Sequence, residues 1–155
     1  MSSWLAKTNQ QLYQARLLIE LTEEKTDAVE LALYQSSVYQ LYLAYNSYLH
    51  ELAEAVRAEH GFSNLDELVS SMSVVLGELR ELEQIEADSF SWLSWLLNEM
   101  EGFKTLSSLP AAKSPMVANL ISSSSTSAIS IDQLTEAYQS LQSLINEQRV
   151  NRSES

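Results

Sequence analysis

The chain has 155 residues, which fits one domain, and its two prolines and three glycines favour a few long helices over many short strands. It contains no cysteine, which excludes disulfides, thiolate metal sites and thiol nucleophiles. The net charge of −12, with nine basic residues scattered along the chain, argues against binding to nucleic acid or to anionic membranes and favours an apolar or basic protein partner.

The sequence has no recognisable segment for membrane targeting. The N-terminal stretch MSSWLAKTNQQL lacks the continuous apolar core of a signal peptide. No window reaches the roughly 18 uninterrupted apolar residues that a membrane-spanning helix needs. We therefore expect a soluble, cytoplasmic protein that does not bind membranes.

The first apolar pattern predicts a helix that begins at Ser2 or Ser3 and ends near Glu23 or Glu24. Either serine can cap the helix, because its hydroxyl oxygen can accept a hydrogen bond from a free backbone amide. Apolar side chains then recur at helical spacing on one face. They are Leu5, Leu12, Ala15 and Ile19.

The second helix is predicted over residues 26–60, because no glycine or proline interrupts this segment before Gly61. Two adjacent apolar bands cover more than half of its circumference. A helix with such a surface contacts neighbours on several sides, so we expect it to be the centre of a bundle. Its polar remainder is Ser36, Gln40, Ser47, Glu51 and Glu54.

Two further helices are predicted before residue 107. Asn64 can cap the first of them, and a run of serines followed by Gly77 predicts a kink or break near Ser73. Asp88 or Ser89 can open the next helix. Its inward face is expected to hold Trp92, Leu96, Met100 and Phe103.

The composition changes towards the C-terminus. Residues 107–130 contain both prolines and a run of four serines, which is typical of a surface connection. Ser130 and Gln133 form a capping-box pattern at the start of a last helix, and residues 149–155 are expected to fray. Together these patterns predict one all-α domain over residues 1–155, a mainly antiparallel bundle of four or five helices around a long central second helix.

Both histidines of the chain, His50 and His60, lie in the short stretch YLHELAEAVRAEH, together with Glu54 and Arg57. On a helix, His50, Glu54 and Arg57 would share one side and could form a metal site or an acid–base set. A carboxylate-bridged metal bundle needs Glu-x-x-His segments, which this chain lacks. The missing ligands favour the alternative, an ion-pair ladder on a solvated helix edge. We expect no catalytic residue, no bound metal and no cofactor, since nucleophile-elbow and phosphate-loop motifs are also absent.

The aromatic residues offer a second candidate site. Five of the seven tyrosines lie in the predicted second helix. Tyr42, Tyr45 and Tyr48, together with Trp92 and Trp95, could line a pocket for a small ligand or form a protein interface. Helical spacing also explains the tyrosines as core residues whose hydroxyl groups reach the surface.

Three segments carry a resemblance to a known group of proteins: SWLAKTNQQLYQARLLIE, ALYQSSVYQLYLAYNSYLHELAE and LQSLINEQR. Together they resemble a family of short, uncharacterised bacterial helical proteins over most of the chain. This resemblance implies a cytoplasmic bacterial protein of unknown function, and it transfers no functional residues.

The chain is also similar, more weakly, to the HEPN group of four-helix bundles, which includes ribonuclease toxins and non-catalytic partners of nucleotidyltransferases. The HEPN catalytic pattern places four to six residues between an arginine and a histidine. Only two residues separate Arg57 from His60 here. This resemblance therefore implies at most a non-catalytic, partner-binding bundle.

The sequence thus predicts a non-enzymatic protein-interaction or scaffolding module, most simply a homodimer. A small-ligand-binding bundle with a pocket lined by tyrosine and tryptophan is the alternative. A HEPN-like protein with a role related to nucleic acids is a weaker third interpretation.

Overall fold

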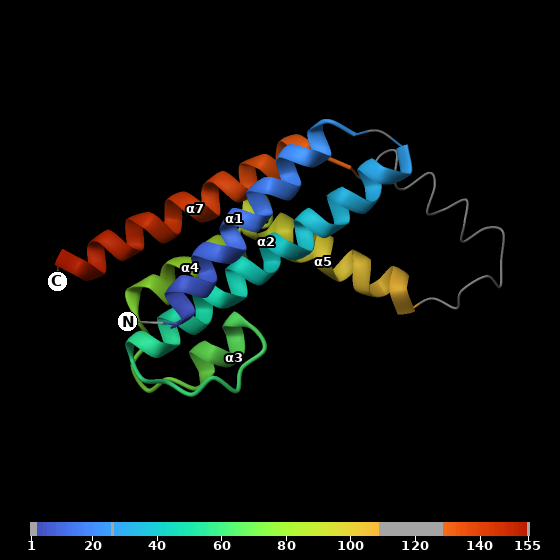
Figure 1. The fold of residues 1–155 in the computed structure, drawn as a ribbon. Coiled ribbons are helices and arrows are strands. Elements are labelled where there is room, and N and C mark those ends of the chain that lie inside the picture. Colours follow the sequence, from blue (N-terminus) through green and yellow to red (C-terminus); the bar gives the residue numbers. More distant parts are fainter. Residues whose placement is uncertain (1–2, 26, 109–128, 155) are drawn as a thin grey trace.

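A computed structural model describes residues 3–25, 27–108 and 129–154 of the chain (Figure 1). Its described helices are α1 (Ser3–Glu23), α2 (Asp27–Ala55), α3 (Leu65–Ser70), α4 (Gly77–Ala87), α5 (Trp92–Ser108) and α7 (Ile131–Glu154). The predicted all-α class is confirmed, since no strand occurs within these ranges. The predicted connection over residues 107–130 falls mostly outside the described residues, as does Ser2 as a cap.

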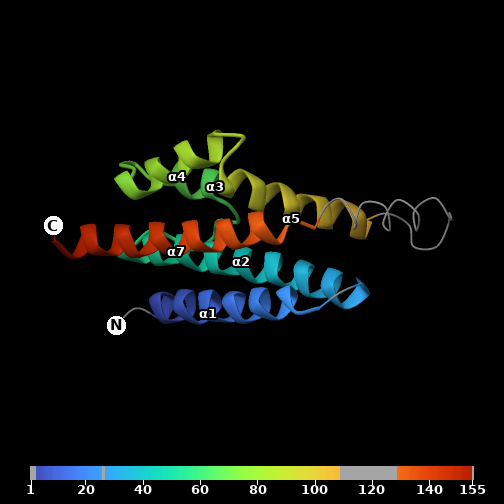
Figure 2. The same cartoon turned by 90° about the horizontal axis from the view of Figure 1, so that it is seen from above.

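Helices α1, α2, α5 and α7 form a bundle in which successive helices alternate in direction (Figure 1). Figure 2 shows α1 as one outer layer, α2 and α7 in the middle, and α3, α4 and α5 on the opposite side. Helix α2 is the longest of the described helices, and it contacts α1, α5 and α7. The prediction of a mainly antiparallel bundle around a long second helix is therefore confirmed.

The α1–α2 hairpin packs through a face of α1 that alternates small and large side chains at steps of four and three residues. That face consists of Thr8, Leu12, Ala15, Ile19 and Thr22. Thr8 and Thr22 donate their hydroxyl protons to the carbonyl oxygens four residues earlier, at 2.8 and 2.6 Å, so these buried hydroxyls are satisfied. Small side chains at every second step let the two helix axes approach closely.

Helix α2 ends at Ala55, and the prediction that it continues to His60 is wrong. Arg57 adopts the left-handed conformation with φ of 57°, a place more often held by glycine. Two backbone hydrogen bonds close the helix in a Schellman motif, Ala58 N–H to the Ala53 carbonyl at 2.8 Å and Arg57 N–H to the Glu54 carbonyl at 3.1 Å. The turn at Arg57 folds the segment with His60 back towards the bundle.

The predicted break near Ser73 is confirmed, because α3 ends at Ser70 and α4 begins only at Gly77. Asn64 caps α3 as predicted, since its Oδ1 accepts a hydrogen bond from the Glu67 backbone amide at 2.8 Å. The short α3 and the following α4 pack on each other, and α4 then packs on α5.

Helix α5 begins at Trp92, later than predicted, because Asp88 ends α4 instead of opening the next helix. The residue that caps α5 is Ser91, whose hydroxyl oxygen accepts a hydrogen bond from the Ser94 backbone amide at 3.1 Å. The residues that were predicted to form the first turn of α5 therefore belong to the turn between α4 and α5.

The last helix begins as predicted, with the Ser130 hydroxyl oxygen accepting a hydrogen bond from the Gln133 amide at 3.2 Å. The predicted frayed tail is wrong for residues 149–154, because α7 continues to Glu154. Arg149 and Arg152 form tertiary contacts that hold this end in the helix. None of the described helices is long and apolar enough to cross a membrane.

Candidate functional site

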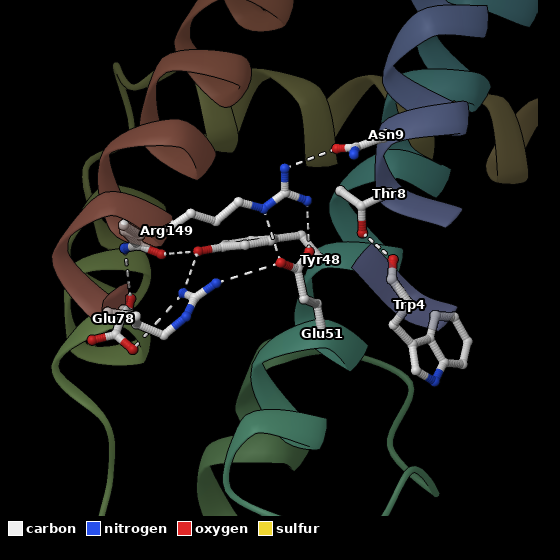
Figure 3. A network of polar contacts seen from close by, with 9 residues as sticks. Trp4, Thr8, Asn9, Tyr48, Glu51, Glu78 and Arg149 are labelled. Carbon is white, nitrogen blue, oxygen red and sulfur yellow. Dashed lines mark hydrogen bonds and ion pairs between the residues drawn. The ribbon is translucent and has the colours of Figure 1, made fainter. Parts of the chain in front are cut away.

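A network of polar side chains lies at the end of the bundle where α1 begins and where α2 and α7 end (Figure 3). Glu51 of α2 is at its centre and is 5% exposed. Both of its carboxylate oxygens accept hydrogen bonds at 2.9 Å from the guanidinium group of Arg149. A second guanidinium, that of Arg152, lies 3.4 Å from the same carboxylate. A planar two-point contact of this kind is the strongest geometry for an arginine–carboxylate pair.

Tyr48 forms the second part of the network, one helical turn before Glu51. Its side chain is fully buried, and its hydroxyl group donates to Gln148 Oε1 at 2.5 Å and accepts from Arg152 Nη1 at 3.0 Å. Burial raises the pKa of Tyr48 to about 12, although the hydrogen bond and positive charge of Arg152 act in the opposite direction. Tyr48 therefore stays protonated and acts as a hydrogen-bonding group.

The same network extends to two more helices. Arg149 donates to Asn9 Oδ1 of α1 at 2.8 Å. Figure 3 shows its side chain extended across the site towards Asn9. Gln148 donates to the backbone carbonyl of Glu78 and to the side chain of Glu81, both in α4, at 3.3 and 3.2 Å. The network therefore joins α1, α2, α4 and α7 at one end of the bundle. Its carboxylate is ion-paired and oriented, which suits a structural clamp better than proton transfer.

A surface pocket of about 270 Å³ opens beside this network. It is lined by Leu5, Glu51, Glu54, Ala55 and Arg152. The predicted site residue Glu54 thus lies next to the buried pair, while Arg57 lies beyond the end of α2 and is exposed.

The two histidines come together on the neighbouring surface. His50 Nδ1 and His60 Nδ1 are 2.7 Å apart. The Trp4 ring lies parallel to His50 at a centroid distance of 4.3 Å, and Phe62 lies against the same imidazole at 4.4 Å. Figure 3 shows the Trp4 indole turned away from the polar network. Within the described ranges, no set of three or more His, Cys, Asp or Glu side chains is placed to hold a metal ion.

The predicted aromatic residues pack in the bundle. Tyr45 and Tyr48 are buried, while Tyr42, Trp92 and Trp95 are partly buried and pack against the core. Only Tyr48 takes part in the polar network just described. Two surface pockets formed by described residues are lined by other side chains.

Tyr45 differs from Tyr48 in one respect: its buried hydroxyl group has no hydrogen-bond partner among the described residues. Burial is the main cause that raises the pKa of Tyr45, followed by the charge of Glu86. Glu86 lines a second surface pocket, of about 380 Å³, together with Leu65, Asp66, Glu83 and Ala87. The pKa of Glu86 is raised as well, first by burial and then by the charges of Asp66 and Glu83.

Removing the hydroxyl groups of these two tyrosines should have different effects. We expect Tyr48→Phe to lower the free energy of unfolding by about 1–2 kcal/mol, because Gln148 loses its buried donor. Tyr45→Phe should change it by less than about 0.5 kcal/mol or raise it, since the removed hydroxyl is buried without a described partner. Urea unfolding of the two variants and the wild type measures the difference. If both variants lose the same free energy of unfolding, the hydrogen bonds of Tyr48 do not stabilise the fold in the way proposed.

The sequence did not identify the residues at the centre of this site. Glu51 was assigned to the solvated remainder of the second helix, and Arg149 to a frayed tail. One signal was present in the sequence: Glu51 follows Ala44 and Ser47 at steps of three and four, and all three side chains are buried. A band of small residues predicts close packing against a neighbouring helix, so a carboxylate on that band needs a buried partner.

The comparisons with known proteins identify a family. Neither the curated proteins nor the solved structures include one that matches the chain. A family model does match, and it covers residues 1–155. The predicted resemblance to an uncharacterised family is therefore confirmed, and the chain belongs to DUF6586, a family of unknown function.

Proposed function

We propose that this protein is a non-enzymatic interaction module that works through helix–helix contact, and that it associates with a second copy of itself through the outer face of α1. The observation that carries the proposal is an apolar stripe on that face. Tyr13, Leu17 and Leu21 are 54%, 43% and 41% exposed, although they are large apolar residues.

The stripe lies on the side of α1 that faces away from the core. Its members follow one another at steps of four residues, which aligns them along one helical face. The buried face, which includes Leu12 and Ile19, points to the opposite side. Since α1 is an outer layer of the bundle in Figure 2, the stripe is open to a partner along the helix.

The charges of α1 favour a second, antiparallel copy as that partner. Lys7 lies near its N-terminal end and Glu20 and Glu23 lie near its C-terminal end, while Arg16 lies past its middle and pairs with Glu20 at 3.6 Å. This order opposes the helix dipole, which favours carboxylates near the N-terminus and cations near the C-terminus. An antiparallel pair centred at the level of residue 15 would bring Lys7 of one copy to the same level along the helix axis as Glu23 of the other. It would also pack Tyr13 against Leu17.

Electrostatic repulsion between two copies of the chain is expected to be smallest where their α1 helices meet. The chain carries a net charge of −12, which opposes self-association. Within α1 the two basic and two acidic residues cancel, so the remaining helices and loops carry the negative charge. A stable contact still needs roughly 1,000 Å² of buried surface, and a helix of six turns can supply much of that area from both copies.

Sedimentation of the purified protein at micromolar concentrations tests the proposal. We expect a dimer of the 17.4 kDa chain, and we expect Leu17→Glu to shift it to a monomer, because a buried carboxylate without a partner costs several kcal/mol. Phe90→Glu is the matched control, since Phe90 is 96% exposed and lies outside α1. This control should remain a dimer.

The orientation is tested by charge reversal. Glu23→Lys should weaken the dimer several-fold, and adding Lys7→Glu should restore it, because the double variant exchanges the two charges. A wild-type protein that sediments as a monomer throughout, or a dimer that breaks with Phe90→Glu but not with Leu17→Glu, would overturn the proposal.

A further inference from the structure

The two histidines meet edge to edge. Their Nδ1 atoms are 2.7 Å apart, their ring planes differ by 9°, and their centroids are 5.0 Å apart. The centroid separation exceeds the nitrogen separation by about two ring radii, so each Nδ1 points at the other. This is the geometry of an N–H···N hydrogen bond between two imidazoles.

Aromatic rings fix this pair in place. The Trp4 indole lies parallel to both imidazoles, 4.3 Å from His50 and 5.7 Å from His60. Phe62 packs against His50 as well, at 4.4 Å and an interplanar angle of 26°. The pair therefore ties the start of α1, the end of α2 and the segment 56–64 to one another.

The hydrogen bond depends on the number of protons that the pair holds. When both rings are neutral, one ring carries its proton on Nδ1 and donates to the Nδ1 lone pair of the other. The first added proton can enter at Nε2 of the donor ring, which leaves the bond in place and makes the donor cationic. The second added proton must enter at the acceptor Nδ1, so that two N–H groups then face each other and the bond is lost.

The surroundings oppose full protonation. The pKa of His50 is lowered by burial, then by the neighbouring His60, and then by Lys7 of α1, whose ammonium group lies 4.8 Å from the Trp4 ring. The nearest carboxylates along the chain are Glu51, which follows His50 and is paired with Arg149, Glu54, one turn after His50, and Glu59, next to His60.

We infer that His50 and His60 form an acid-sensitive latch, which holds the segment 56–64 against the end of the bundle and releases it when both imidazoles are protonated. Release uncovers Trp4 and Phe62, which are partly buried in the closed form. The latch is distinct from the proposed dimer contact of α1, because His50 and His60 do not belong to the apolar stripe of Tyr13, Leu17 and Leu21.

The pH range of release follows from the direction of the shift. A histidine whose pKa is lower in the folded than in the unfolded protein stabilises the fold above its unfolded pKa of about 6.5, and this contribution is lost as the pH falls below that value. The closed form should therefore dominate at pH 7.5, and opening should increase progressively below about pH 6.5.

Hydrogen exchange and NMR test the latch in the full chain. We expect amide exchange in residues 56–64, corrected for its intrinsic pH dependence, to become at least several-fold faster between pH 7.5 and 5. The two imidazoles should titrate in two coupled steps. In His60→Gln this dependence on pH should become much smaller, and the pKa of His50 should rise, because glutamine can hydrogen-bond but takes up no proton.

Two controls make the result decisive. His50→Gln should behave like His60→Gln, which covers the case in which one variant fails to fold, and Glu59→Gln should keep the response of the wild type. The latch is refuted if the wild-type exchange shows no such change. It is equally refuted if His60→Gln or His50→Gln keeps the change, or if each imidazole titrates unchanged when the other is removed.

Discussion

Replacing Arg149 with methionine is expected to lower the free energy of unfolding by about 3 kcal/mol. The carboxylate of Glu51 is 5% exposed and receives both of its short hydrogen bonds from Arg149. Methionine fills much of the arginine side-chain volume but leaves this buried charge with only the longer contact to Arg152, at 3.4 Å. Urea unfolding monitored by circular dichroism measures the loss.

A double variant separates the charge pair from simple packing. Glu51→Leu combined with Arg149→Met removes both charges, and its stability should return to within about 1 kcal/mol of the wild type, because no unpaired charge is left. Arg149→Lys should give an intermediate loss, since an ammonium group cannot form the planar two-point contact. If the double variant is less stable than Arg149→Met, the pair does not have the assigned role.

Leu41→Ala is expected to lower the free energy of unfolding by about 3 kcal/mol as well, for a different reason. Leu41 is fully buried near the middle of α2, the helix that contacts α1, α5 and α7. Alanine would leave a cavity at the centre of the bundle, where the neighbouring helices cannot easily close on it. Thermal and urea unfolding of the variant measure the effect.

Val29→Ala on the same helix is the control for this substitution. Val29 is 53% exposed, so its truncation removes little buried surface, and alanine has the higher helix propensity. Its effect should stay within about 0.5 kcal/mol. Similar losses for the two variants would show that α2 is not the packing centre of the fold.

The elements of the fold could be predicted because their signals are local. The seam of α1, the break before α4 and the caps at Asn64 and Ser130 depend on residues a few positions apart. The end of α2 could not be predicted in this way. Arg57 takes a conformation in which glycine is usual, and only the closing hydrogen bonds of the Schellman motif and the packing of the following segment favour it there.

The candidate site was only partly accessible from sequence. His50 and His60 stood out because the chain has no other histidine, but their contact depends on the turn that ends α2. The predicted line of His50, Glu54 and Arg57 assumed a helix through that turn. Trp4, which covers both imidazoles, had no local signal of this role because it lies in another helix.

The sequence by itself determined that the chain is all-helical, which faces of its helices are apolar, and that α2 is central, because helical periodicity is written in the spacing of neighbouring residues. Only the tertiary structure decided which charges and rings meet. Glu51 and Arg149 are 98 positions apart in the chain, and no periodic pattern encodes their pairing. It arises because α2 and α7 end side by side, where burial of the carboxylate makes a bound guanidinium group necessary.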